Sequence, residues 1–246
     1  MKQDIDQASD IQRYPLGKRY AIDDRVFRYA RAGGTLNTDL GAKNALLQCI
    51  AFTTIHASVS AGATQVSIDV AAGDGVLNNG VIGVDELAGG YIVIYPHSEN
   101  SFVRRIVKNT ATTGAGEMTL TLDKPLPCAL TTVMHAECIA SIYSNVTSVN
   151  NGFMSIVGVP TVPATVGQYL WIQTWGPCWI APHGGVGKND SDMAAYFGGD
   201  AGVIQGDELN PAGTSVALTN QYAGFVLASA KDNGQGAPFI MLQIAP

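Results

Sequence analysis

The residues of this chain that could do chemistry fall into a few short groups, and one group lies in a glycine-rich segment. Residues 184–189 (GGVGKN) partly match a loop that cradles phosphate with backbone N–H groups. That loop requires a glycine five positions before Gly187 and a magnesium-binding Ser or Thr after the lysine. Pro182 and Asn189 occupy those two positions here. We therefore predict no nucleotide-binding role for this segment.

Cysteine and histidine side chains could together bind zinc. The chain has four cysteines and four histidines, but it lacks the C-x-x-C pair typical of structural zinc sites. The Asn-Asp-Ser-Asp run at 189–192 likewise lacks the later Glu of a calcium loop. We predict reduced, buried cysteines and no metal. The zinc ligands considered are Cys128, His135, Cys138, Cys178 and His183.

Two pairs of adjacent carboxylates, Asp85-Glu86 and Asp207-Glu208, are the remaining candidates for acid/base chemistry. Neighbouring side chains on a strand point to opposite faces, so such a pair seldom acts on one substrate. The sequence also contains no G-x-S-x-G motif. We predict a protein that is not an enzyme and uses no cofactor. A hydrolase with carboxylates on loops is the least favoured alternative.

Charge is unevenly distributed along the chain. Residues 1–31 contain seven of the 14 Lys and Arg against five acids, whereas the other 215 residues carry seven against fifteen, for a net charge of −8. A body of that charge is a poor partner for nucleic acid. Residues 138–187 contain no Asp, Glu, Lys or Arg. Since solvated faces normally carry charge, these residues are predicted to be strands buried in a core, or in a core and against a partner.

The N-terminal residues combine arginine with aromatic side chains, a composition enriched in contact surfaces. We predict an extended arm over residues 1–35 that is flexible over residues 1–12. As a strand, residues 25–31 would place Phe27 and Tyr29 on one face, and as a helix they would align three arginines. The arm could contact a partner or pack on its own acidic body. The candidate contact residues are Arg13, Tyr14, Arg19, Arg25, Phe27, Arg28, Tyr29 and Arg31.

Alternating apolar residues and turn dipeptides predict a mainly β protein, an antiparallel sandwich or barrel-like body. The run at 64–70 (TQVSIDV) has the period of two expected of a strand. We predict a main β domain over residues 36–182, and over residues 183–246 a glycine-rich loop region and C-terminal strands that complete it. Residues 42–55 could be a helix or a buried strand. Other strands are predicted at 91–95, 102–107, 118–122, 138–143, 153–159, 169–174, 178–180, 224–228 and 239–244, with turns at Asn79-Gly80, Asn151-Gly152 and Asn233-Gly234.

Neither a secretory signal nor a membrane span is visible. The first 14 residues (MKQDIDQASDIQRY) are charged and lack the apolar region of a signal peptide. Every apolar run is far shorter than the roughly 20 residues that a spanning helix needs. We therefore expect a protein that is made in a cytoplasm and has no membrane partner.

Several segments resemble a group of tailed-phage virion proteins that are found among head proteins and usually taken as capsid decoration, or cement, proteins. The most distinctive segment is residues 167–178 (GQYLWIQTWGPC). In order, the matching segments cover most of residues 13–180. The others are residues 13–17 (RYPLG), 24–30 (DRVFRYA), 87–92 (LAGGYI) and 120–126 (LTLDKPL).

The resemblance implies a non-enzymatic structural protein on the outer surface of a phage capsid, made in the cytoplasm of the bacterial host. Its partners would be the major capsid protein, contacted by the N-terminal arm, and further copies of itself, with a trimer favoured. An alternative is a tail- or fibre-associated carbohydrate-binding module, in which Trp171, Trp175 and Trp179 would stack on sugar rings. In a decoration protein these tryptophans would be ordinary core residues.

Overall fold

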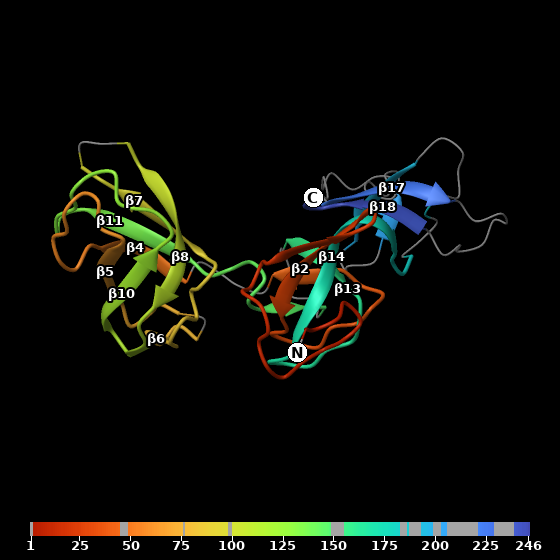
Figure 1. Ribbon diagram of the computed structural model, residues 1–246, viewed down its shortest axis with the longest axis horizontal. Coiled ribbons are helices and arrows are strands. Elements are labelled where there is room, and N and C mark those ends of the chain that lie inside the picture. Colours follow the sequence, from red (N-terminus) through yellow and green to blue (C-terminus); the bar gives the residue numbers. More distant parts are fainter. Residues whose placement is uncertain are drawn as a thin grey trace, which may run out of the picture. The chain divides into compact units, whose positions relative to one another are not determined.

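The protein is all-β, and its antiparallel sheets curl into half-barrels (Figure 1). The computed structural model describes residues 2–44, 49–75, 77–97, 100–148, 155–182, 186, 193–198, 203–205, 221–228 and 239–246, with the backbone alone at 203–205. These residues include no helix. The prediction of a mainly β fold is therefore confirmed. Within the same residues, no helix is long and apolar enough to cross a membrane.

The chain forms two compact units, and one is inserted into the other. Unit 1 comprises Met1–Ala45 and Tyr143–Pro246, and unit 2 is Leu46–Ile142. The predicted boundaries at 35/36 and 182/183 followed changes in composition. The units instead follow strand pairing, which joins segments from both ends of the chain and is invisible to composition.

Unit 2 is a six-stranded sheet that curls until its edge strands meet. An isolated bridge joins Ile55, just after β4, to Ile68 in β5. The predicted alternation in β5 places Val66, Ile68 and Val70 in the core. The sheet order is β4 (Ile50–Thr54), β11 (His135–Ile139), β7 (Tyr91–Tyr95), β8 (Phe102–Asn109), β10 (Gly116–Leu122) and β5 (Gln65–Val70), with a small ribbon of β6 (Val81–Ile82) and β9 (Thr112–Thr113).

Unit 1 is built around one long strand, β14 (Tyr169–Trp179). Its first part pairs with β2, its middle with β13 and its last part with β18. The sheet order is β12 (Val146–Thr147), β3 (Ala42–Asn44), β13 (Ile156–Pro160), β14, β18 (Phe239–Gln243), β17 (Tyr222–Ala228), β15 (Ala194–Phe197) and β16 (Val203–Gln205), with β2 (Arg25–Arg31) on β14 and β1 (Arg19–Ile22) on β2.

The N-terminal residues form part of the core of unit 1, and this corrects the prediction of an extended arm. The side chains of Phe27 and Tyr29 in β2 are fully buried. Residues 2–12 also lie on the body, because Ser9 exchanges two backbone hydrogen bonds with Tyr169 and the Gln3 side chain donates to the Tyr169 carbonyl at 2.8 Å. Of the two alternatives for residues 25–31, the strand is the one observed, but the surface that Phe27 and Tyr29 face belongs to the same chain.

Several other local predictions differ from the structure. Residues 42–55 contain two separate strands, β3 in unit 1 and β4 in unit 2. Residues 183–246, predicted as a glycine-rich loop region followed by C-terminal strands, contain β15 and β16 in the part predicted as loop. Of the predicted turns, only Asn79-Gly80 lies within the described residues, and Gly80 has the left-handed φ of +72° that favours glycine there.

Deletion of residues 1–31 should unfold unit 1 and leave unit 2 intact, because it removes a strand from β14 and empties the space filled by two aromatic rings. Differential scanning calorimetry of the full chain should show two transitions, and the truncated chain should keep only one. Phe27→Ala in the full chain should lower the stability of unit 1 by about 3–5 kcal/mol. Two unchanged transitions after truncation would show that β2 is dispensable.

Residues 46–142 should fold when produced alone, since unit 2 has its own continuous core. In this fragment Ile94→Ala, at a fully buried position, should cost about 2–5 kcal/mol in urea unfolding. Val103→Ala is the matched control, because Val103 is 52% exposed and surface changes stay within about 0.5 kcal/mol. An unfolded fragment, or equal losses in the two variants, would contradict an independent unit 2.

Candidate functional site

The predicted aromatic residues of the N-terminus meet one of the predicted tryptophans in a single cluster. The Trp171 ring centroid lies 5.0 Å from that of Tyr29, 5.2 Å from that of Tyr14 and 5.5 Å from that of Tyr20. Such tilted and edge-on contacts are favourable for aromatic pairs. Ile5 and Phe27 complete the buried part of this cluster.

A buried polar network fixes the cluster to the first residues of the chain. The Tyr29 hydroxyl donates to Gln3 Oε1 at 2.5 Å and accepts a bond from the Arg13 backbone N–H at 3.1 Å. Gln3 Nε2 donates to the backbone oxygens of Gln7 and Tyr169. Burial raises the pKa of Tyr29, so the hydroxyl stays protonated and keeps donating. Residues 3–13 are thus held by paired polar groups.

The predicted arginines lie in different environments. Arg13, Arg19 and Arg31 are exposed, whereas Arg25 and Arg28 are half-buried. Arg25 lies over the Phe27 ring, with its guanidinium carbon 5.5 Å from the ring centroid. Arg28 donates to the Pro246 carbonyl at 2.9 Å, and its buried Nε atom has no hydrogen-bond partner. Only the three exposed arginines have their side chains open to solvent.

A pocket of about 410 Å³ opens beside the aromatic cluster. Gln3, Ile5 and Trp171 are the buried residues of its lining, and Tyr14, Tyr20 and Ile22 are half-buried. The exposed residues of the lining are three cations and one acid, namely Lys2, Lys18, Arg19 and Asp4. The predicted site contained only Tyr14, Arg19 and Trp171 of this set. Lys2 and Lys18 were not among the predicted contact residues, although the high density of cations in residues 1–31 could have pointed to them.

The three predicted tryptophans do not form one platform. Trp171 is 3% exposed, whereas Trp179 is 42% exposed and Trp175 is half-buried. Trp175 and Trp179 lie on the part of β14 that pairs with β18. They face outward there, because the intervening Cys178 belongs to the core of this sheet.

That outward side of β14, β18, β17 and β15 forms a continuous apolar surface, the aromatic sheet face. Trp179 pairs with Phe239, and Pro177 pairs with Met241, which in turn pairs with Phe225. None of the residues in these four strands is Asp, Glu, Lys or Arg. The face comprises Trp175, Pro177, Trp179, Phe239, Met241, Phe225, Leu227, Tyr222, Ala194 and Tyr196, all half-buried or exposed. Large exposed apolar patches mark interaction sites.

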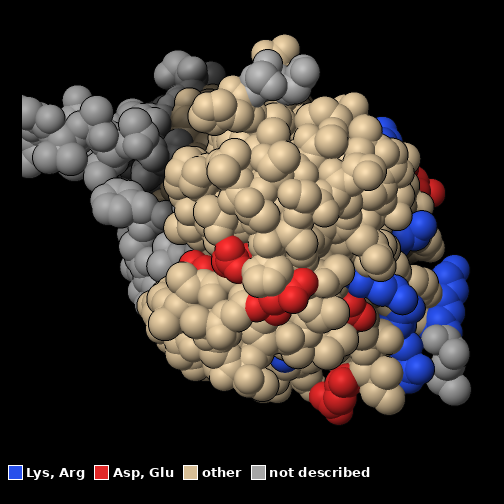
Figure 2. Space-filling model, turned by 90° about the vertical axis from the view of Figure 1, so that its left-hand side faces the viewer, with Lys and Arg blue, Asp and Glu red and all other residues tan. Residues whose placement is uncertain are grey.

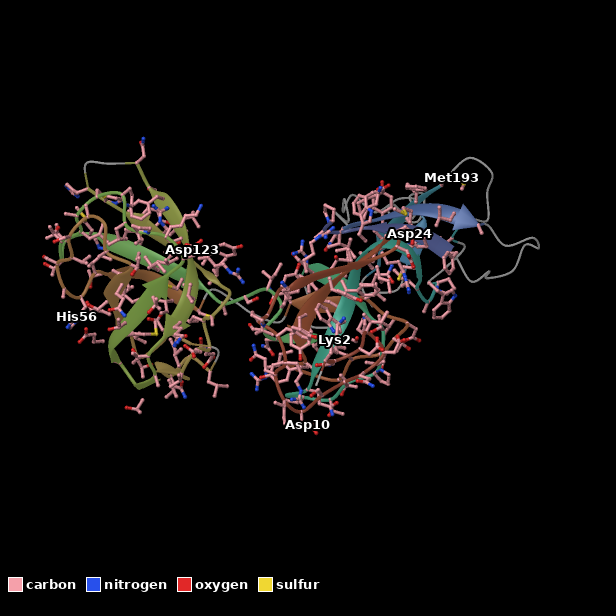
Figure 3. All side chains as sticks on the ribbon, in the orientation of Figure 1. Lys2, Asp10, Asp24, His56, Asp123 and Met193 are labelled. Atoms are coloured by element: carbon pink, nitrogen blue, oxygen red, sulfur yellow. The ribbon has the colours of Figure 1, made fainter. Side chains whose placement is uncertain are left out.

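Unit 2 carries a polar cluster on strands β4, β5 and β10. His56 Nδ1 lies 2.6 Å from Asp69 Oδ1, and His56 Nε2 lies 3.5 Å from Glu117 Oε2. Thr54 Oγ1 donates to Asp69 Oδ2 at 2.5 Å. The bond to Asp69 raises the pKa of His56, and the Thr54 and His56 bonds lower that of Asp69. Figure 3 labels His56 on unit 2, and Figure 2, which views that side, shows acidic and basic side chains on an otherwise uncharged surface.

A second exposed group of unit 2 lies on β4, β11 and β7. The Phe52 ring stacks on His135 with 4.4 Å between centroids, and the Tyr95 hydroxyl donates to Glu137 at 3.1 Å. Phe52 is 59% exposed and has a φ of +26°, at a point where the pairing of β4 with β11 is irregular. His135 is therefore engaged in ring stacking rather than with the cysteines.

The cysteines lie within the two cores. Cys49, Cys138 and Cys178 are buried, Cys128 is half-buried, and all four are free thiols. Burial raises the pKa of Cys178 to about 12 and raises that of Cys138 further. In the described part of the chain, no three His, Cys, Asp or Glu side chains are grouped as metal ligands.

The other predicted motifs are placed only in part. Asp85 and Glu86 accept bonds from backbone N–H groups of Asn109 and Gly83 and so hold the turn before β7. Asp207-Glu208, His183 and the 189–192 run lie outside the described residues, as does all of the 184–189 segment except Val186.

No family model, no curated protein and no solved structure matches this chain. The candidate surfaces are the aromatic sheet face, the pocket beside the aromatic cluster of unit 1, and the two side-chain clusters of unit 2.

The His56–Asp69 pair should give the histidine a titration midpoint above 6.5. Because the pKa of His56 is raised, the pair adds stability below pH 6.5 that is lost as the pH rises through the folded pKa. Because the pKa of Asp69 is lowered, the pair also adds stability above pH 3.8 that is lost on acidification. The pair therefore stabilises the protein most between pH 3.8 and pH 6.5. NMR titration should show the His56 midpoint falling toward 6.5 in Asp69→Asn. Glu117→Gln is the control and should lower it less, because its carboxylate is farther away; an unchanged midpoint in Asp69→Asn would refute the pairing.

Proposed function

We propose that this protein is a non-enzymatic structural component of a tailed-phage virion that binds the outer capsid surface. Its partners would be the major capsid protein and further copies of itself. The resemblance in residues 13–180 suggests this class of protein, and the trimer favoured at threefold positions rests on that resemblance alone. The physical support comes from one surface of unit 1.

The aromatic sheet face is the observation that carries the proposal. Interface centres are depleted in charge and enriched in aromatic residues and methionine, and this face has that composition. Trp179 and Phe239 are directly paired and are 42% and 44% exposed, so both rings remain available for contact. A paired, rigid sheet also loses little conformational entropy on binding. The face therefore suits a broad apolar contact with another protein surface.

The exposed arginines would supply the polar part of the contact. Arg13, Arg19 and Arg31 are open to solvent and can pair bidentately with carboxylates of a partner. Phe27 and Tyr29 would act indirectly, since as core residues they hold β2 and its arginines in place. Many copies on one lattice gain affinity together even when each contact is modest.

The alternative of a carbohydrate-binding module that stacks sugar rings on all three tryptophans has less support. It requires the three side chains to lie on one exposed surface. Trp171 is 3% exposed and lies in the buried aromatic cluster with Tyr29, whereas Trp175 and Trp179 lie within an apolar face that extends over four other strand segments. The breadth of this face favours a protein partner over a single sugar ring.

The double substitution Trp179→Ala with Phe239→Ala should weaken binding to heads assembled without this protein. A hot-spot aromatic residue contributes about 2 kcal/mol or more, so the dissociation constant should rise at least about thirtyfold if one of the two rings is a hot spot. Cosedimentation with purified heads measures this directly. Tyr91→Ala in unit 2, at an equally exposed aromatic position (45%), is the matched control and should bind as the wild type does.

Sedimentation equilibrium on the same variants separates the two partners. If the double variant loses self-association but still binds heads, the face joins copies of this chain. If the wild type neither associates nor binds heads, the proposed function is wrong.

A further inference from the structure

We propose that the pocket between residues 2–22 and β14 binds a carboxylated sugar ring, of which a hexuronic acid is the simplest example. The pocket is distinct from the aromatic sheet face, because the two share no residue; Arg19 alone belongs both to the pocket and to the arginines assigned to the capsid contact. It rests on the shape, the aromatic lining and the charge of the pocket, all within unit 1.

The size of the pocket fits a ring-sized ligand. Its volume of about 410 Å³ lies within the roughly 300–1,000 Å³ of typical small-molecule sites. Ile5, Ile22 and Trp171 border it with apolar groups, and the half-buried Tyr14 and Tyr20 supply the aromatic rings that a ligand can reach. Aromatic rings present an apolar face together with a polar hydroxyl, which is the combination that a sugar ring with its C–H face and hydroxyl groups can use.

The charge of the pocket selects an anion. Lys2, Lys18 and Arg19 line it together with a single acid, Asp4. One oxygen of Asp4 already accepts the Ile5 backbone N–H at 2.7 Å. Lys2 lies with its Nζ atom 5.6 Å from the centroid of the Tyr20 ring, so a cation is held beside an aromatic wall. Figure 3 labels Lys2 in this part of unit 1. A carboxylate on the ring would meet this positive charge.

The pocket is preorganised by bonds that a ligand need not form. The side-chain amide of Gln3 accepts a hydrogen bond from the Tyr29 hydroxyl and donates to the backbone carbonyls of Gln7 and Tyr169. Thr161 Oγ1 donates to the Ile5 carbonyl and approaches the Trp171 carbonyl at 3.1 Å. The N-terminal segment is thereby fixed on β14, so binding would cost little ordering of the protein.

An acidic side chain from a protein partner is a weaker match. A carboxylate on a flexible chain could pair with the exposed lysines without entering the pocket. The half-buried tyrosines would then have no role in recognition. A ring that carries its own carboxylate uses both parts of the lining.

Binding of sodium glucuronate to the full-length protein, followed by ¹⁵N–¹H NMR, tests the proposal. Glucuronate should saturate the protein and shift the Trp171 indole N–H signal. Glucose, which has a hydroxymethyl group in place of the carboxylate, should bind at least about tenfold more weakly, as expected for loss of a charge-assisted contact. A hexaglutamate peptide provides the carboxylate without the ring and should not shift the Trp171 signal.

Variants assign the binding to the pocket. Lys18→Gln with Arg19→Gln should weaken glucuronate at least about tenfold, and Tyr20→Ala should weaken it independently of salt. Lys108→Gln, an exposed cation of unit 2, is the matched control and should change nothing. Thermal unfolding confirms that each variant is folded. Equal binding of glucose and glucuronate, unchanged binding in the double variant, or a Trp171 shift with hexaglutamate alone would overturn the proposal.

Discussion

The structure of unit 1 depends on the pairing of β14 along both of its edges. Trp175 pairs with Val26 of β2 and with Gln243 of β18, so segments from near the two chain ends meet on one residue. Gly176 permits this approach, because a Cβ atom there would lie 2.2 Å from the Asp24 carbonyl oxygen. The pocket lies beside the β2 half of the strand and the aromatic sheet face beside the β18 half. One strand therefore positions both candidate surfaces.

Local patterns in the sequence predicted most strands but not their partners. Alternation located β5 and β7 closely, since side chains of a half-buried strand report which face is inside. The N-terminal arm was wrong because alternation in residues 25–31 says that one face is covered, not which chain covers it. Residues 42–55 were ambiguous for a related reason. The boundary between the two units falls inside this run, between Ala45 and Leu46, and no change in composition marks it.

The sequence predicted what kinds of residues the candidate surfaces contain, but not which residues come together in them. Within the described residues, the uncharged run at 138–187 supplies many core side chains of unit 1, as its composition predicted. The aromatic sheet face, however, also needs Phe225 and Phe239, which lie far along the chain. Likewise, the cations of residues 1–31 indicated a positive region, while the pocket depends on Trp171 and on the ordering of Gln3. Charge and hydropathy can be counted within one segment. A site, however, combines side chains from several strands, and which of them lie together depends on which strands pair and in which register.

The insertion of unit 2 has a consequence for the order of folding. β2 must find β14 across the whole of unit 2, and such long-range closure is slow. The ends of unit 2 are neighbours, since Ile50 pairs with Cys138. Once unit 2 has folded, it acts as a short link, which lowers the entropic cost of joining β2 to β14 by about 1 kcal/mol. During synthesis, all of unit 2 has been made before β18. On the nascent chain, unit 2 would therefore be folded while unit 1 still lacks β18.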